Sequence, residues 1–251
     1  MPTKPIRNAL RDTAHSQTVV PHMKNRNLTY IIGIFILLLT FDLKAQTPEM
    51  ETNENRIDRD FVSSSEVKEK INGQSYTENE INLILEKAND SLYSIYVFNK
   101  TTDSLKISSQ DWHLFLIQEA KNENGDWKPI EYWKYSWCGN SYLSDKLEPS
   151  GILKTESKVY NGNYKTQIRF KLLNDNKVYY SNSMVGYVNL SQFEIPNNIT
   201  DYRTYKRIET RGSSELLKKI IFLEPNGMKE FMEKEEAYLE KMAELRKKNK
   251  N

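Results

Sequence analysis

The chain has 251 residues, of which 38% are hydrophobic, 11% aromatic and 28% charged. This mixture is too aromatic for a wholly disordered chain and, at a mean hydropathy of −0.72, too polar for a protein with several membrane spans. With 36 basic and 34 acidic residues, the formal net charge of +2 excludes a protein that binds polyanions through its overall charge.

Residues 23–45 have the three-part layout of a secretory signal peptide. Two basic residues open the segment, residues 30–41 form an uncharged apolar run, and the small residue Ala45 precedes Gln46. The apolar run is too short to span the bilayer, because a spanning helix needs about 20 residues. We therefore expect cleavage between Ala45 and Gln46 and export to the periplasm or the extracellular space. An uncleaved membrane anchor is the alternative interpretation.

Residues 1–22 are polar and show no apolar periodicity, whereas Met23 opens the signal segment directly. We expect translation to begin at Met23 and residues 1–22 to be a non-native upstream extension. The mature chain from Gln46 would keep 206 residues, with 30 basic and 32 acidic side chains. No electrostatic footprint for nucleic acid remains. The single cysteine, Cys138, allows no internal disulfide, so an apolar core must hold the fold.

The first part of the mature chain changes character near residue 65. Residues 46–65 are charged and polar, which predicts a disordered tether. Residues 66–90 are expected to hold a short helical segment, because Thr77 and Glu80 have capping-box spacing. The apolar residues that follow share one helical face: Ile81, Ile84, Leu85 and Ala88.

Residues 91–212 are expected to form a domain of strands. Hydrophobic and polar residues alternate most clearly from Tyr164 to Leu172, which predicts a strand with one buried and one solvated, basic face. Lys165, Arg169 and Lys171 lie on that second face, and binding of an anionic polymer is the alternative to simple solvation. Roughly seven or eight short strands at 8–12-residue spacing indicate an antiparallel β-sandwich.

Three segments carry a family resemblance. Asn99–Thr102 follows the first strand, Gly125–Ile130 enters a tryptophan-bearing strand, and Leu147–Leu153 enters a later one. On these features the stretch from Leu92 to Leu190 resembles the immunoglobulin-like or fibronectin-type modules of secreted bacterial proteins. The resemblance implies a mainly β fold, an immunoglobulin-like antiparallel β-sandwich, and it implies no activity.

Residues 213–251 are expected to form a helical tail. Residues 213–223 fit a helix slightly better than a strand, and Met228 to Lys248 is a strong helix former with acidic residues early and basic residues late. The helix from Met228 to Lys248 has an apolar stripe that should pack against another element, either the N-terminal helical segment or a second chain. Glu235 interrupts the heptad pattern of this stripe, which argues against a long homodimeric coiled coil. The stripe contains Phe231, Met232, Tyr238, Leu239 and Met242.

An aromatic segment around residues 131–142 is the most suggestive feature for function. Trp133, Tyr135 and Trp137 would project from one face of a strand, with Tyr142 nearby. Aromatic side chains in this pattern usually build a core, and this is the preferred interpretation. The alternative is that these four residues bind a ligand, either a partner protein or a carbohydrate.

Catalytic and metal-binding patterns are weak throughout the mature chain. It offers one cysteine and one histidine, Cys138 and His113, and neither a G-x-S-x-G motif nor a glycine-rich phosphate loop. One histidine and one cysteine cannot supply the four N or S ligands of a structural zinc site. We therefore expect no catalytic residue, no metal and no cofactor.

These observations predict an exported, non-enzymatic binding or interaction protein with an unknown protein or carbohydrate partner. Nucleic acid is not expected as a partner, the membrane would be contacted only through the signal segment, and the C-terminal helix could mediate association. The alternative is a secreted hydrolase, for which Glu119 or Glu131 could serve, or a protease inhibitor that presents the loop at residues 131–142.

Overall fold

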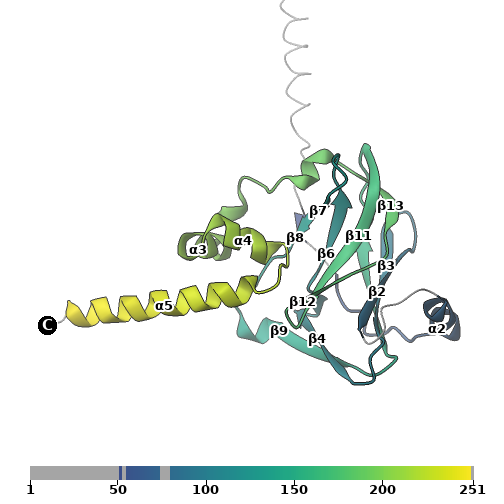
Figure 1. Ribbon diagram of the computed structural model, residues 1–251, viewed down its shortest axis with the longest axis horizontal. Coiled ribbons are helices and arrows are strands. Elements are labelled where there is room, and N and C mark those ends of the chain that lie inside the picture. The colour runs from purple at the N-terminus through teal and green to yellow at the C-terminus, as the bar shows by residue number, and fades with distance from the viewer. Residues whose placement is uncertain (1–50, 53–54, 74–79, 250–251) are drawn as a thin grey trace, which may run out of the picture. The chain divides into compact units, whose positions relative to one another are not determined.

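The computed structural model describes residues 51–52, 55–73 and 80–249. These residues all belong to one compact unit, Pro48–Asn251. The expected upstream extension, the signal peptide at residues 23–45 and the proposed capping residue Thr77 lie outside the described residues. The described part of the chain consists mainly of strands in antiparallel sheets, together with several helices (Figure 1).

The largest sheet has five strands and is organised by β11, its longest strand. β11 pairs with β6 along one edge, and with β13 and then β12 along the other. The predicted alternation is confirmed, because Ile168, Phe170 and Leu172 on one face of β11 are fully buried. The strands of this sheet are β6 (Leu116–Lys121), β7 (Trp127–Pro129), β11 (Tyr164–Asn174), β12 (Lys177–Tyr180) and β13 (Met184–Val188).

A three-stranded antiparallel sheet shares an apolar core with the five-stranded one. It contains β2 (Ile81–Lys87), β3 (Leu92–Asn99) and β10 (Ile152–Lys158), with β3 in the middle. The ring of Tyr93 on β3 meets the ring of Phe170 edge-on, with centroids 6.0 Å apart. The remaining strands are β4 (Leu105–Gln110), β5 (His113–Leu114) and β9 (Tyr142–Leu147) in a third antiparallel sheet, and the parallel pair β1 (Glu51–Thr52) and β8 (Glu131–Tyr132).

The helix expected over residues 81–88 is wrong, because this segment is strand β2. Both faces of β2 are buried: Leu83 and Leu85 point into the core shared by the two sheets, whereas Ile84 packs under helix α2 (Ser65–Asn72). Burial on both faces places apolar residues at consecutive positions. Such a run also contains the i, i+3, i+4 spacing of a helix, so periodicity alone could not separate the two structures.

Part of the segment expected to be a tether is packed against the sheets. Asn55 and Ile57 are buried, and the backbone N–H of Ile57 donates to the carbonyl of Trp112 at 2.8 Å. The Asn55 side chain donates to the carbonyl of Leu116 in β6 at 2.8 Å. Residues 55–58 are therefore an ordered part of the domain rather than a free linker.

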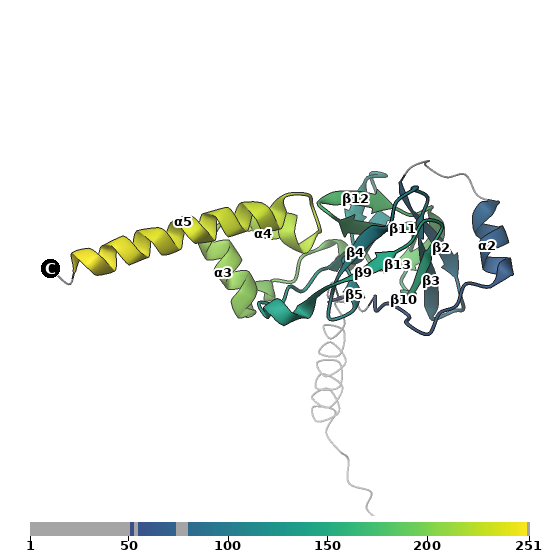
Figure 2. The ribbon, with the colours of Figure 1, turned by 90° about the horizontal axis from the view of Figure 1, so that it is seen from below.

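Three helices follow the strands, and the helix expected at Met228–Lys248 is confirmed. They are α3 (Arg203–Arg211), α4 (Ser214–Ile221) and α5 (Gly227–Lys248), preceded by the short 3-10 turns η3 (Leu190–Phe193) and η4 (Ile199–Asp201). α3 and α4 pack against the start of α5 and build a second apolar core over the sheet (Figure 2). None of the helices in the described part of the chain combines the length and apolar character needed to cross a membrane.

Of the two covers expected for the stripe on α5, the N-terminal helix at residues 81–88 is wrong, because residues 81–87 form strand β2. Of the predicted stripe only Phe231 is buried, and it contacts α3 and α4. Glu235, which interrupts the stripe, is also buried.

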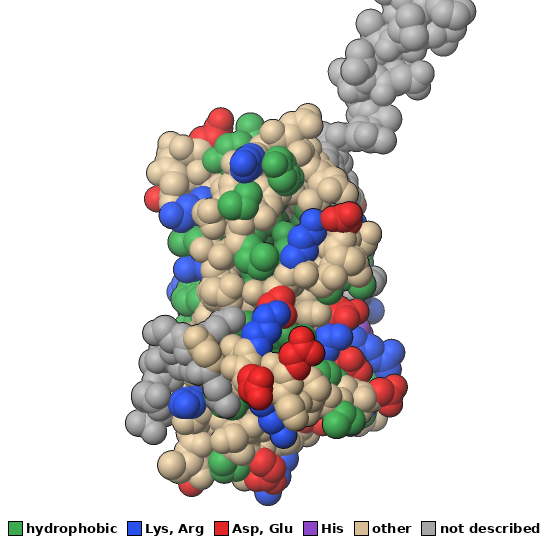
Figure 3. All heavy atoms as spheres, turned by 90° about the vertical axis from the view of Figure 1, so that its right-hand side faces the viewer, with side chains coloured by type: hydrophobic (Ala, Val, Ile, Leu, Met, Phe, Trp, Pro, Cys, Tyr) green, Lys and Arg blue, Asp and Glu red, His purple; other side chains and the backbone are tan. Residues whose placement is uncertain are grey.

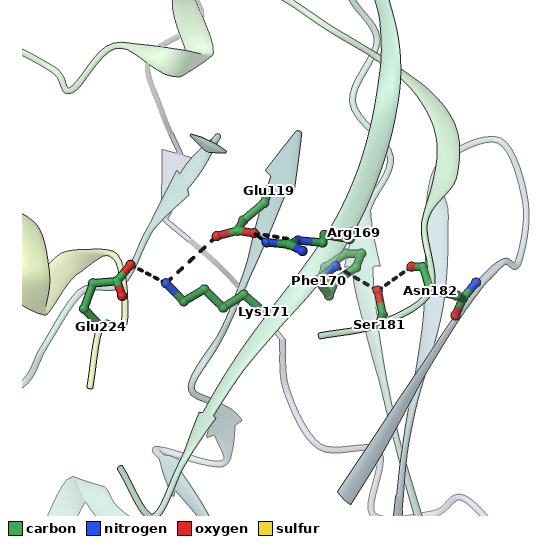
Figure 4. Close-up of polar contacts among 7 residues, drawn as sticks. All are labelled: Glu119, Arg169, Phe170, Lys171, Ser181, Asn182 and Glu224. Carbon is green, nitrogen blue, oxygen red and sulfur yellow. Dashed lines mark hydrogen bonds and ion pairs between the residues drawn. The ribbon is translucent and has the colours of Figure 1, made fainter. Parts of the chain in front are cut away.

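A buried cation ties the helices to the sheet (Figure 4). Lys171 on β11 is 2% exposed, and its ammonium lies 2.5 Å from Glu224 in the connection between α4 and α5 and 3.9 Å from Glu119 on β6. Arg169 makes two close contacts with the same Glu119, at 2.6 and 2.7 Å. The prediction of a solvated basic face therefore fails at Lys171, because the helices cover this end of β11.

Two lysines on the same face of β11 test this arrangement. Lys171→Ala should lower the free energy of unfolding by about 1–3 kcal/mol, because it removes the buried ammonium that pairs with Glu224, whereas Glu119 keeps its pair with Arg169. Lys165→Ala, at an exposed position of the same strand, should change it by less than about 0.5 kcal/mol. Urea denaturation measures both values, and equal effects would contradict the burial of Lys171.

Candidate functional site

An apolar cavity of about 200 Å³ lies between the aromatic loop, defined here as residues 133–142, and the helices. Tyr135, Trp137 and Tyr142 of the predicted ligand-binding set line it. Trp133, the fourth member of that set, lies outside the lining and is buried. The other lining residues are Ser136 of the loop, Thr204 and Ile208 of α3, and Met228 and Met232 of α5.

The inner part of the aromatic loop is fixed by hydrogen bonds to the helices. The backbone N–H of Trp133 donates to the carbonyl of Ile221 at the end of α4, at 2.7 Å, and the hydroxyl of Tyr205 on α3 donates to the carbonyl of Trp133, at 2.8 Å. The ring of Phe115 packs against Trp133 and Tyr135, with centroids 4.9 and 5.9 Å away. This part of the loop therefore belongs to the apolar core, as the sequence predicts for aromatic side chains in this pattern.

The outer part of the loop leaves two rings half-exposed at the cavity. Trp137 and Tyr142 are each 43% exposed. Trp137 packs on Phe231 of α5 at a centroid distance of 5.6 Å, and the guanidinium of Arg207 lies 4.8 Å from its ring. The hydroxyl of Tyr142 donates to the carbonyl of Ser136 at 2.7 Å, across the 3-10 turn η2 (Gly139–Ser141). Both rings are thus held in place while one side remains accessible.

The helical wall of the cavity is held by a charge cluster between α3 and α5. Arg207 and Arg211 on α3 both donate to the buried carboxylate of Glu235 on α5. The hydrogen bond from Arg207 is the main cause that holds the pKa of Glu235 below its usual range, and the bond and charge of Arg211 act in the same direction. This cluster joins the two helices whose residues Ile208, Met228 and Met232 line the cavity. It also explains the acidic residue within the apolar stripe.

The lining is mostly apolar and can bind apolar groups. It contains no carboxylate, imidazole or thiol, and burial raises the pKa of both Tyr135 and Tyr142, so their hydroxyls stay neutral. Cys138 is exposed on the loop, whereas the Nδ1 atom of His113 lies 3.2 Å from the carbonyl of Gln110.

Glu119 and Glu131, the two carboxylates that a hydrolase could use, both form contacts away from the cavity. Glu119 is paired with Arg169, and Glu131 accepts hydrogen bonds from the backbone and side chain of Gln118 and from the Tyr160 hydroxyl, at 2.8–2.9 Å. Both are buried, and neither lines the cavity. Among the residues that the structure describes, no group of three or more His, Cys, Asp or Glu is placed to hold a metal ion.

The sequence predicts the residues on the loop side of the cavity but not those on the helical side. Met228 and Met232 belong to the predicted tail, but nothing in their spacing indicated the loop as their neighbour. Thr204 and Ile208 are one turn apart on α3, inside the range 91–212 that is expected to be a domain of strands. Their helical spacing was the available signal.

No protein-family model matches the chain, and no curated protein matches it. The class that fold and site define is accordingly broad: a mainly β domain with a helical cap and an aromatic cavity between the two.

Protonation of Glu235 should loosen the helical wall. Because the pKa of Glu235 is lower in the folded state, its pairing stabilises the protein fully above its unfolded pKa, near 4.5, and this stability is lost as pH falls through the folded value. The unfolding free energy of the wild type should therefore drop more between pH 5 and about pH 3 than that of Glu235→Gln. The exposed neighbour Glu236→Gln is the matched control, and identical slopes for Glu235→Gln and the wild type would contradict the role of the cluster.

Proposed function

We propose that this chain is a non-enzymatic binding protein whose cavity holds one large apolar side chain of a partner protein. The observation that carries the proposal is the cavity itself, with three aromatic and three aliphatic or thioether side chains around about 200 Å³. Small-molecule sites usually enclose roughly 300–1,000 Å³, whereas an apolar cavity of about 150 Å³ can hold benzene. The space therefore suits a single ring or branched side chain.

A protein fits this lining better than a carbohydrate does. Sugars present many hydroxyl groups that need hydrogen-bond partners, and a buried hydroxyl without one is costly. The polar side chains here are Ser136, Thr204 and the tyrosines, and the hydroxyl of Tyr142 already donates to the loop backbone. Aromatic and methionine side chains instead match the pockets that receive anchor residues at protein interfaces.

We further propose that the protein is exported and that its strands form an immunoglobulin-like β-sandwich. Two antiparallel sheets that share one apolar core support the sandwich, and the layout of residues 23–45 supports export. Nucleic acid is not proposed as a partner, and the membrane would be contacted only through the signal segment.

A protease inhibitor is a second candidate, favoured by one observation. Residues 137–140 are exposed at the tip of the loop, and Ser136 holds them through a hydrogen bond from the backbone N–H of Cys138 at 3.1 Å. A loop fixed in this way could enter a protease cleft. Trp137 belongs to both the tip and the cavity, so the two functions are separated at Asn140, which is exposed at the tip and lies outside the cavity lining. Asn140→Ala should weaken protease inhibition and leave the binding of cavity peptides unchanged if the loop tip acts as an inhibitor.

Filling the cavity should abolish binding. Peptides selected from a displayed random library against the purified protein should share one large apolar residue, and Thr204→Trp should weaken their binding at least tenfold, since the new side chain occupies the cavity. Thr210→Trp introduces the same side chain at an exposed position of α3 and should leave binding unchanged. Equal binding by the two variants would exclude the cavity as the site.

Export has its own test. Mass spectrometry of the protein purified from its native cell should show an N-terminus at or near Gln46. A membrane-bound chain that begins at residue 1 or 23 would show an anchor instead.

A further inference from the structure

From Met232 to Leu245, α5 carries an apolar stripe that is largely exposed, although the guanidinium of Arg211 on α3 lies 4.3 Å from the ring of Tyr238. α5 has 22 residues, and both views show it extending past α3 and α4 (Figures 1 and 2). Near α2 and β13, by contrast, hydrophobic side chains appear as small patches among polar and charged ones (Figure 3). The exposed apolar residues of α5 are Met232 at 51%, Tyr238 at 40%, Leu239 at 52% and Leu245 at 44%.

A largely exposed apolar stripe of this kind favours a partner. An isolated helical segment of about ten residues is marginal in water, because most helix stability comes from packing an apolar face. At about 100° per residue, the four exposed side chains fall within about 140° of one another, a width typical of a packed face. The second half of α5 is therefore expected to be covered in solution.

The spacing of the four residues indicates which partner fits. Met232 and Leu245 lie equally far from the midpoint between Tyr238 and Leu239, so the stripe has the same spacing in both directions along the helix. An identical helix that runs antiparallel would place Leu245 of one copy opposite Met232 of the other, and Tyr238 opposite Leu239. This self-complementarity is the requirement for a two-fold interface.

The charges along α5 favour the same arrangement. Residues 227–237 contain four glutamates and two lysines, whereas residues 238–248 contain two glutamates, three lysines and one arginine. The halves thus carry formal charges of −2 and +2. An antiparallel pair sets opposite charges side by side, whereas a parallel pair sets like charges together. Glu235 does not oppose such a pair, because Arg207 and Arg211 of its own chain neutralise it.

We propose that α5 forms an antiparallel pair with α5 of a second copy of this chain, centred between Tyr238 and Leu239. The proposal is independent of the cavity, apart from Met232, which lies at the end of the stripe and also lines the cavity. Met232 is for this reason left unchanged in the tests.

The first test is the mass of the protein, expressed from its full-length gene, in sedimentation equilibrium. The wild type should be dimeric, and Leu239→Lys should weaken self-association at least tenfold, because a charge enters the centre of the pair. Leu190→Lys makes the same change at a residue that is 46% exposed in η3 and should leave the dimer intact. A monomeric wild type, or a dimer that Leu239→Lys leaves unchanged, would overturn the proposal.

The second test determines the direction of the helices. In a Cys138→Ser background, Leu239→Cys lies near the two-fold axis and should form an intermolecular disulfide on oxidation. Leu245→Cys should not, because its counterpart would lie about 20 Å away along the pair, beyond the roughly 7 Å between Cα atoms that a disulfide allows. Cross-linking of both variants would show a parallel pair and overturn the proposal. Leu239→Lys should still bind cavity peptides, so failure of the dimer and failure of the cavity are distinguishable.

Discussion

β11 is buried on both faces at its C-terminal end, and this constraint organises the molecule. Its inner face carries Phe170 into the core that the two sheets share, whereas its outer face at Lys171 lies under the helices. A lysine can be buried here because Glu119 and Glu224 balance its charge from the neighbouring strand and from the α4–α5 connection. The strand that holds the sheets together therefore also fixes where the helical cap sits.

The position of the cap determines the cavity. α4 accepts a hydrogen bond from the backbone of Trp133, so the aromatic loop and the helices have a fixed separation at their inner end. Further out, the hydrogen bonds of Arg207 and Arg211 to Glu235 join α3 to α5. Between these two points the loop and the helices diverge, and the space between them is lined by rings and methionines. The cavity thus lies between segments that polar contacts join at its borders.

α5 has different roles along its length. Its first two turns belong to the core through Phe231, and its C-terminal half carries exposed apolar residues and a net positive charge. A deletion of the entire helix would therefore remove part of the core together with the proposed dimer surface. Point substitutions in the second half separate these roles.

The sequence by itself determined those features that depend on one local pattern. The alternation in β11, the helix after Met228 and the buried inner part of the aromatic loop follow from side-chain period and composition, and all three are present. The signal-peptide layout is also a local pattern, but the signal peptide stays a prediction, because residues 23–45 lie outside the described residues. Predicting such features requires no information about residues that are distant in sequence.

Only the tertiary structure decided the features that depend on what lies opposite. Residues 81–87 form a strand because α2 and the core cover its two faces, and a segment with both faces buried has no distinctive period. From its strand pattern Lys171 is predicted to be solvated, but in the structure it is buried and lies 2.5 Å from Glu224, which is distant in sequence. The cavity joins the loop to α3 and α5 across about 60–100 residues. Local periodicity carries no information about such pairings, because they are fixed by packing between segments far apart in the chain.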